Sequence, residues 1–173
     1  IFNEYGLSLF DCLHISTHGG SMRYYLTKSN NIERSNNLKK QLEKEDKLGL
    51  LSMDSYIEFS NKCEKARKGF KERLMKFKSE NKKIIGYGAT SKSTTILNYC
   101  NVGNDLIEYI VDTTPTKHYT FTPGKHIPVL PYENFLPHPD VSVLFAWNHK
   151  KEILEKESDY KGHWITHLYE EYI

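Results

Sequence analysis

Short apolar runs alternate with helical patterns over the second half of the chain, and this alternation constrains the fold most. The expected strands are residues 83–88, 106–112, 141–148 and 163–168. The helical patterns between them are residues 91–100, 132–136 and 150–160. Nearly continuous apolar strands separated by helices are typical of a parallel sheet covered on both faces. Residues 81–173 are therefore predicted to form a small Rossmann-like three-layer α/β domain with a mostly parallel sheet.

Two other zones precede this domain. Residues 1–28 hold two β-rich runs around a turn, which predicts a pair of strands. Residues 29–80 are predicted to form a helical linker with a long helix that opens at Asp54. Its apolar residues are spaced three or four apart and predict one stripe: Tyr56, Phe59, Cys63, Ala66, Phe70, Leu74 and Phe77. A two-stranded ribbon is marginal alone, so we expect the pair to dock elsewhere or to form a dimer through its edges.

Charge and composition exclude several classes of protein. The chain has 24 Lys and Arg against 22 Asp and Glu, which argues against a protein devoted to coating nucleic acid. No apolar run approaches the roughly 20 residues that cross a bilayer, and the first residues lack a secretory signal pattern. Cys12, Cys63 and Cys100 have neither disulfide nor zinc spacing, and the histidines do not cluster either. We therefore expect a cytoplasmic protein with no metal site.

The strongest local signal is a strand that runs through a glycine turn into a helix. Two glycines allow a tight turn and a close approach of a ligand, and the first helical turn presents free N–H groups to an anion. The candidate anion-binding residues are Gly86, Gly88, Ala89, Thr90, Ser91 and Lys92. Ser91 stands where both the dinucleotide and the P-loop fingerprints need a glycine, so neither is matched. A plain packing role for the turn stays equally open.

Other candidates lie at the ends of predicted strands, where parallel sheets keep their ligands. Asp112 would accept a hydrogen bond from a sugar hydroxyl, or cap the next turn. Trp147 would stack on a base or sugar, and Asn148 would bind a polar edge; the alternative is a half-buried Trp followed by a helix cap. Lys117 lies in the long loop and would reach a phosphate or stay solvated.

The turn before the second run of the strand pair is the other unusual cluster. His18 and Arg23 flank two glycines, which suggests a backbone that a ligand approaches closely. An ordinary hairpin turn explains the same residues equally well. No Ser-His-Asp or Cys-His spacing is present, so we predict no catalytic residue in this chain.

Several blocks together give a family resemblance over most of the chain. They are residues 18–23 (HGGSMR), residues 86–100 (GYGATSKSTTILNYC), residues 109–112 (YIVD), residues 123–129 (PGKHIPV) and residues 146–148 (AWN). The chain resembles the C-terminal region of S-adenosylmethionine-dependent C-methyltransferases that act on nucleotide-linked deoxysugars. These blocks are much more specific than a glycine turn alone.

The resemblance implies a division of labour within the intact enzyme. Family members have a zinc-binding N-terminal domain, a central methyl-donor domain, and a Rossmann-like domain that helps to hold the nucleotide sugar. The present sequence lacks the zinc cysteines, the glycine-rich methyl-donor loop and the segment that supplies the general base. Residues 1–28 would then be the last strand pair of the methyl-donor domain. The resemblance therefore implies a nucleoside-diphosphate sugar as ligand, no cofactor bound to this chain, and no methylation by the chain alone.

Two other functions stay open on the sequence. One is a Rossmann-like module that binds another nucleotide of the NAD or coenzyme A type. The other is a non-catalytic interaction domain that uses the basic face of the long helix, although a solvated face explains those charges as well. Stabilisation by particular nucleotides would separate the three.

Overall fold

The computed structural model describes residues 1–17, 20–29 and 31–167. The chain packs into two compact units, Ile1–Asn61 and Lys62–Ile173, and each is described by itself below. The boundary between them falls inside one helix, α2, which spans Met53–Ser79. The predicted division into residues 1–28, 29–80 and 81–173 stays a prediction.

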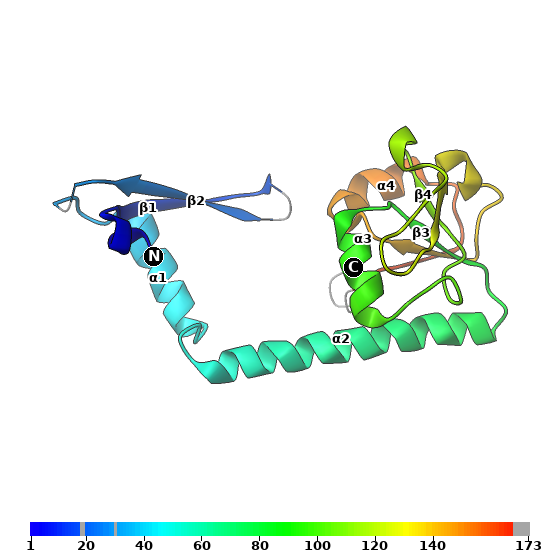
Figure 1. Cartoon of the computed structure of the whole chain (residues 1–173), viewed down its shortest axis with the longest axis horizontal. Coiled ribbons are helices and arrows are strands. Elements are labelled where there is room, and N and C mark those ends of the chain that lie inside the picture. The colour runs from blue at the N-terminus through cyan, green and yellow to red at the C-terminus, as the bar shows by residue number, and fades with distance from the viewer. Residues whose placement is uncertain (18–19, 30, 168–173) are drawn as a thin grey trace. The chain divides into compact units, whose positions relative to one another are not determined.

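The first unit contains the predicted strand pair. Strands β1 (Ser8–Ile15) and β2 (Ser21–Thr27) are antiparallel, and helix α1 (Asn36–Lys47) contacts β1 (Figure 1). A short 3-10 turn, η1 (Phe2–Tyr5), precedes β1. Ser35 caps α1, because its hydroxyl accepts a hydrogen bond from the amide of Leu38 at 3.1 Å. The expected strand pair is confirmed, and its pairing with another sheet or a second copy stays a prediction.

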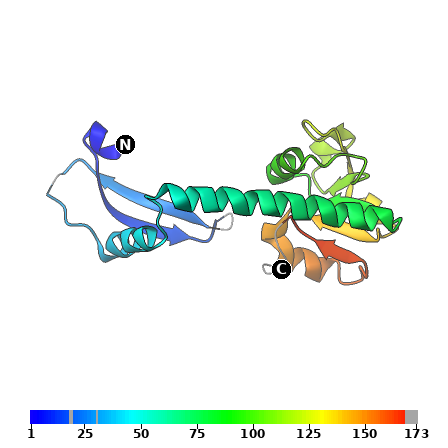
Figure 2. The ribbon, with the colours of Figure 1, turned by 90° about the horizontal axis from the view of Figure 1, so that it is seen from below.

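Helix α2 is one continuous helix (Figure 2), and it does not bury the whole of its predicted apolar stripe. Phe70 and Leu74 are fully buried in the core of the second unit. Tyr56 and Phe59, in the first turns of the helix, are 54% and 66% exposed. The stripe is therefore a core-facing surface only in its C-terminal half. Helical spacing alone does not show how far along a helix the covering sheet extends.

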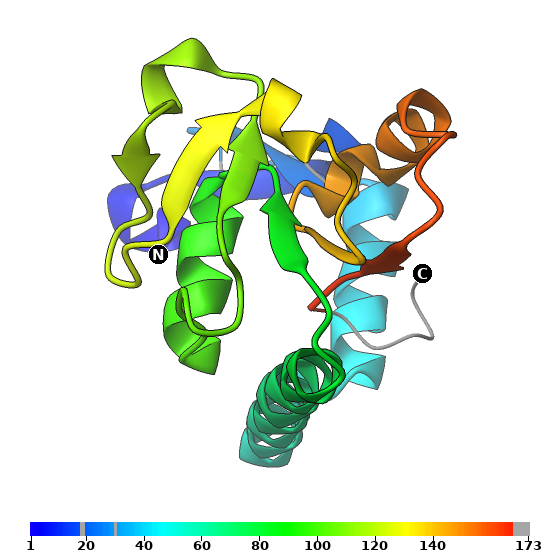
Figure 3. The ribbon, with the colours of Figure 1, turned by 90° about the vertical axis from the view of Figure 1, so that its right-hand side faces the viewer.

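The second unit is built on a six-stranded sheet (Figure 3). Its strands are β3 (Ile84–Tyr87), β4 (Ile110–Asp112), β5 (Thr120–Phe121), β6 (Pro128–Pro131), β7 (Val141–Leu144) and β8 (His163–Ile165). Their order is β5-β6-β4-β3-β7-β8, and all neighbours are parallel except β5 and β6. The predicted α/β class with a mostly parallel sheet is confirmed.

Both faces of this sheet are covered. On one face, α2 and α3 (Ser91–Cys100) bury a core that includes Phe70, Leu97 and Val143. On the other face, η4 (Tyr132–Phe135) and α4 (Lys150–Lys156) lie over Ile85 and Leu144. Successive residues of β3 and of β7 enter opposite cores, as the pleat of a strand requires.

Several predicted elements have different bounds. The sheet also contains β5 and β6, where the sequence predicted no strand. The segment predicted as a strand at residues 106–112 is a strand only over Ile110–Asp112. The strand predicted at 141–148 ends at Leu144, and Trp147 and Asn148 lie in a 3-10 turn, η5 (Trp147–His149). The helix predicted at 150–160 ends at Lys156, and residue 168, at the end of the last predicted strand, lies outside the described residues.

The strand order creates a topological switch point. From β3 the chain moves outward through α3 to β4 and β6, and then returns to the opposite side of β3 to form β7 and β8. The helices after β3 and β7 therefore leave toward opposite faces of the sheet. In open α/β sheets, ligands bind outside the carboxyl ends of the strands at such a point.

Across the described ranges, no helix combines the length and the apolar character needed to cross a bilayer.

Candidate functional site

The turn between β3 and α3 is shaped by Gly88 and Thr90. Gly88 has a φ of +91°, and a Cβ atom there would lie 2.9 Å from the Cβ atom of Ala146. Both facts require a residue without a side chain. Thr90 caps α3: its Oγ1 accepts from the amide of Ser93 at 3.0 Å, and the Ser93 hydroxyl donates to the Thr90 carbonyl at 2.6 Å. The helix therefore begins at a fixed place beside the switch point.

Gly86 lies within the sheet, away from any open ligand space. A Cβ atom on this residue would lie 2.8 Å from Cγ1 of Ile110 and 2.9 Å from Cε2 of Phe145. The glycine is buried, and it lets these two core side chains close over the middle of β3. The structure thus gives a packing reason for Gly86 where the sequence suggested the approach of a ligand, and we leave it out of the proposed site.

The backbone amides at the start of α3 are partly engaged. The amide of Ala89 donates to Oδ2 of Asp112 at 2.8 Å. The amides of Ser91 and Lys92, in the first helical turn, have no hydrogen-bond partner among the described residues. Ser91 and Lys92 are exposed. Their two amides and the positive end of the helix dipole therefore face solvent, from which an acceptor group can approach.

Asp112 ties two loops together at the end of β4. Its Oδ1 accepts from the amide of Thr114 at 2.8 Å, and its Oδ2 also accepts from Nζ of Lys117 at 3.1 Å. Lys117 Nζ donates in addition to the carbonyl of Ala89 at 2.9 Å. Burial alone would raise the pKa of Asp112, but the hydrogen bonds from Thr114 and Lys117 lower it below its usual value. The structure therefore shows the capping role for Asp112 and an internal ion pair for Lys117.

Lys92 brings a positive charge to the switch point. Its Nζ donates to Oδ1 of Asn148 at 2.8 Å and lies 5.1 Å from the centre of the Trp147 ring. His167, which follows β8, has a pKa lowered by burial and then by the nearby charges of Lys92 and Arg73. The Lys92 ammonium and the positive end of the α3 dipole both favour an anion at the carboxyl ends of the strands. Arg73 and His167 were not predicted to lie near Lys92, because both are far from the glycine turn in the chain.

A pocket of about 340 Å³ opens beside the turn. It lies at the carboxyl ends of β3, β4 and β7, and α4 and η4 form its far walls. Its lining residues are Tyr87, Gly88, Thr90, Val111, Asp112, Thr113, Thr114, Tyr132, Ala146, His149, Glu152, Ile153 and Lys156.

A buried carboxylate stands behind this pocket. The hydroxyls of Tyr87 and Tyr132 donate to Oε1 of Glu157 at 2.7 and 2.8 Å. Burial and then the Glu157 carboxylate raise the pKa of both phenols, that of Tyr132 to about 12. Both tyrosines therefore stay protonated and locked in place at neutral pH. The three residues are separated by 25 residues or more, and so no sequence motif connects them.

Nine of the twelve predicted site residues lie at or just beyond the carboxyl ends of the parallel strands. They are Gly88, Ala89, Thr90, Ser91, Lys92, Asp112, Lys117, Trp147 and Asn148. Arg23 lies in β2 of the other unit, exposed and opposite Leu13. His18 lies outside the described residues. In the part of the chain that the structure describes, no group of three His, Cys, Asp or Glu residues is placed to hold a metal ion.

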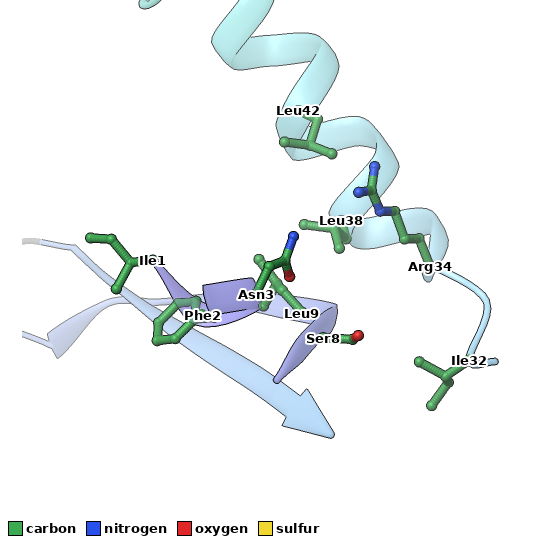
Figure 4. Close-up of a pocket in the computed structure, with 9 residues that line it drawn as sticks. All are labelled: Ile1, Phe2, Asn3, Ser8, Leu9, Ile32, Arg34, Leu38 and Leu42. Atoms are coloured by element: carbon green, nitrogen blue, oxygen red, sulfur yellow. The ribbon is translucent and has the colours of Figure 1, made fainter. Parts of the chain in front are cut away.

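A second hollow lies in the first unit, between α1 and the strand pair. Its volume is about 390 Å³, and Figure 4 shows Leu38 of α1 pointing toward Leu9 of β1 across it. Its lining residues are Ile1, Phe2, Asn3, Ser8, Leu9, Ile32, Arg34, Leu38 and Leu42. None of these is a predicted site residue, so the hollow is not part of the candidate site.

The second unit is thus a Rossmann-like domain, with a capped glycine turn beside the point where the order of its strands reverses. The comparison with known families is more specific. Residues 16–168 match the model of the C-methyltransferase C-terminal domain, and the chain belongs to that family. The expected resemblance is confirmed.

One similar protein is the C-methyltransferase NovU of Streptomyces niveus. The two sequences are 29% identical over 162 residues, which cover 92% of this chain. The same stretch is only 39% of the relative. The chain therefore spans about two-fifths of the length of this C-methyltransferase.

Proposed function

We propose that this chain is the substrate-binding part of an S-adenosylmethionine-dependent C-methyltransferase, and that it holds the diphosphate of a nucleotide-linked keto-deoxysugar. Membership of the C-methyltransferase C-terminal domain family supports the reaction class. The choice of ligand rests on the amides of Ser91 and Lys92, which have no hydrogen-bond partner within residues 1–17, 20–29 and 31–167, and on the Lys92 ammonium, which Asn148 holds by a hydrogen bond. An oxyanion of a diphosphate would accept from these donors and would be attracted by the lysine.

The reaction gives a physical reason for binding the diphosphate, which lies away from the reacting carbon. Methylation at the carbon beside a ketone needs a base to remove an acidified hydrogen, and the resulting nucleophilic carbon must then meet the methyl donor. Binding energy from the remote diphosphate holds the sugar in the orientation that this encounter requires. The residues of this chain bind and orient the ligand, and they do not carry out the proton transfer.

The methyl donor itself does not fit the site at the switch point. S-adenosylmethionine carries a sulfonium cation, and the first turn of α3 presents Lys92 and the positive end of a helix dipole. We therefore assign the methyl donor and the general base to other parts of the intact enzyme, and we expect no methylation by this chain alone. The three cysteines are free, in keeping with a cytoplasmic enzyme.

The contacts of Asp112 disfavour a dinucleotide. In dinucleotide-binding folds, an acidic residue at the end of the second strand accepts hydrogen bonds from a ribose. Asp112 has the equivalent place, at the end of β4, but its oxygens already accept from Ala89, Thr114 and Lys117. Oδ2 already accepts two hydrogen bonds and Oδ1 accepts one, so the carboxylate cannot take two ribose hydroxyls, one on each oxygen, while Lys117 stays bound. This argues against the ribose contact that dinucleotide-binding folds make.

Replacement of Lys92 tests the proposal. In wild-type protein, we expect thymidine or uridine diphosphate to raise the melting temperature, and NAD not to. Lys92→Ala should weaken diphosphate binding by about tenfold or more, and less at high salt, since one charge-assisted contact is lost. Lys125→Ala is the matched control, because Lys125 contacts Asn101 at the opposite end of α3. Equal affinity of the Lys92→Ala and Lys125→Ala proteins, or a response to NAD alone, would reject the assignment.

A further inference from the structure

The first turns of helix α2 present an apolar surface with acidic side chains beside it. Met53 and Ile57 are each more than half exposed. Asp54 and Glu58 are also exposed, and residues 53–61 contain no lysine or arginine. Neighbouring exposed apolar side chains mark an interaction surface, and this one is negatively charged.

The rest of the same helix is basic. Residues 62–79 contain eight lysines and arginines against two glutamates. The ammonium groups of Lys68 and Lys71 form no hydrogen bond or ion pair with any described residue. These two cations can therefore attract an acidic surface from outside the chain.

A hollow of about 250 Å³, here called the α2 hollow, opens on this basic half beside the end of α3. Its lining residues are Arg67, Lys68, Lys71, Glu72, Met75 and Cys100. Met75 and the Cys100 thiol form the apolar part of the lining, because burial raises the pKa of that thiol and keeps it neutral. The three cations and one carboxylate around them sum to +2. The α2 hollow therefore suits an apolar side chain that has acidic neighbours.

The geometry of α2 lets one copy of the chain offer both surfaces to another copy. Eighteen residues separate Ile57 from Met75, which is about five turns of an α-helix, so both lie on the same side of α2. In an antiparallel pair of α2 helices with a two-fold axis near Ala66, Ile57 of each copy meets Met75 of the other. The same pairing places the acidic start of each helix against the basic half of its partner. A parallel pair would instead align the two basic halves, which repel each other.

We propose that α2 is the interface of a homodimer, in which the acidic, apolar start of each helix docks into the α2 hollow of the other copy. This isologous pairing uses both surfaces of both copies at once. It does not use the edges of β1 and β2. It also does not involve the start of α3, so its test is independent of the proposed function.

Sedimentation equilibrium at several concentrations of the chain tests this interface. The wild-type chain should form a dimer whose dissociation constant rises with salt concentration, because salt screens the facing charges. The double variant Asp54→Lys/Glu58→Lys reverses the charge of the helix start, and Lys68→Glu/Lys71→Glu changes that of the α2 hollow from +2 to −2. Each should raise the dissociation constant by about tenfold or more. An equal mixture of the two should restore the dimer, since opposite charges meet again in both halves of the mixed pair.

The control is Lys151→Glu/Lys161→Glu, which makes the same change of net charge at exposed positions outside α2. This control should keep the wild-type dissociation constant. A chain that is monomeric at every concentration overturns the proposal. So does a dimer that both α2 variants leave intact, because its interface would then lie elsewhere, as at the edges of the strand pair. A loss that the mixture does not reverse, or that the control shares, also contradicts the proposed interface.

Discussion

Asp112→Asn tests whether the Asp112–Lys117 pair holds the site together. The carboxylate accepts from three donors, the amides of Ala89 and Thr114 and the ammonium of Lys117, at 2.8 to 3.1 Å. An asparagine keeps one oxygen acceptor but places an NH2 group against donors on its other side. The substitution therefore removes charge-assisted bonds and adds a donor that faces another donor.

The expected loss follows from these contacts. A hydrogen bond to a charged group contributes about 1.5–3 kcal/mol. The Asp112 side chain is 7% exposed, whereas that of Lys117 is 40% exposed, so the lysine regains water when its partner is lost. We expect the free energy of unfolding of the second unit to fall by about 2–3 kcal/mol, near the lower end for removal of one partner of a buried pair.

Urea unfolding followed by tryptophan fluorescence measures this loss. Both tryptophans of the chain, Trp147 and Trp164, lie in the second unit, so their signal reports that unit. The midpoint should fall by about 1 M relative to wild type. The control is Asp105→Asn, which removes the same charge from an exposed position. If both variants unfold at the same urea concentration, the Asp112–Lys117 pair does not stabilise the site.

The same pair predicts a pH dependence. The pKa of Asp112 is lower in the folded protein than the value of 3.8 for an isolated aspartate. Its stabilisation is therefore fully present above that pH, and is lost as the pH falls toward the folded-state pKa. The difference in stability between wild type and Asp112→Asn should be constant near neutral pH and should shrink below about pH 4. A difference that grows on acidification would contradict the assigned direction.

Two further substitutions test the turn and the core. Gly88→Ala should lower stability by about 1–3 kcal/mol, because the φ of +91° is unfavourable for alanine; an unchanged urea midpoint would show that the turn relaxes. Leu74→Ala, at a fully buried site of α2, should cost about 2–5 kcal/mol. Met75→Ala, at a neighbouring position that is 53% exposed, should stay within about 0.5 kcal/mol of wild type. Equal losses at both positions would contradict the one-sided burial of this helix.

Much of the fold followed from local pattern. The apolar run into β3, the spacing in α3 and the pair β1–β2 all have strong periodic signals, and each is present. Strands β5 and β6 were missed because they are only two and four residues long, and β6 begins and ends with Pro. Strand β6 exists because it pairs with β4, a long-range contact that no short window of sequence contains. Strand β5 then pairs with the other edge of β6.

The site was predictable where its residues lie on one turn, and otherwise not. The start of α3 at Ser91 and the position of Lys92 in its first turn follow from a strand that runs into a helix. The roles of Gly86 and Lys117 depend on what packs against them, Ile110 in one case and Asp112 in the other, and those neighbours are set by the sheet order. The network of Tyr87, Tyr132 and Glu157 joins three elements and has no local signature at all.

The most direct test of the central claim is the response of two backbone amides to a nucleotide. In a titration of the isotope-labelled chain with uridine diphosphate, the amide resonances of Ser91 and Lys92 should shift progressively and reach saturation. The amide of Ala89, already bonded to Asp112, should move less. Saturable shifts confined to other parts of the chain, or no shift at Ser91 and Lys92 at saturating nucleotide, would contradict binding of the diphosphate at the start of α3.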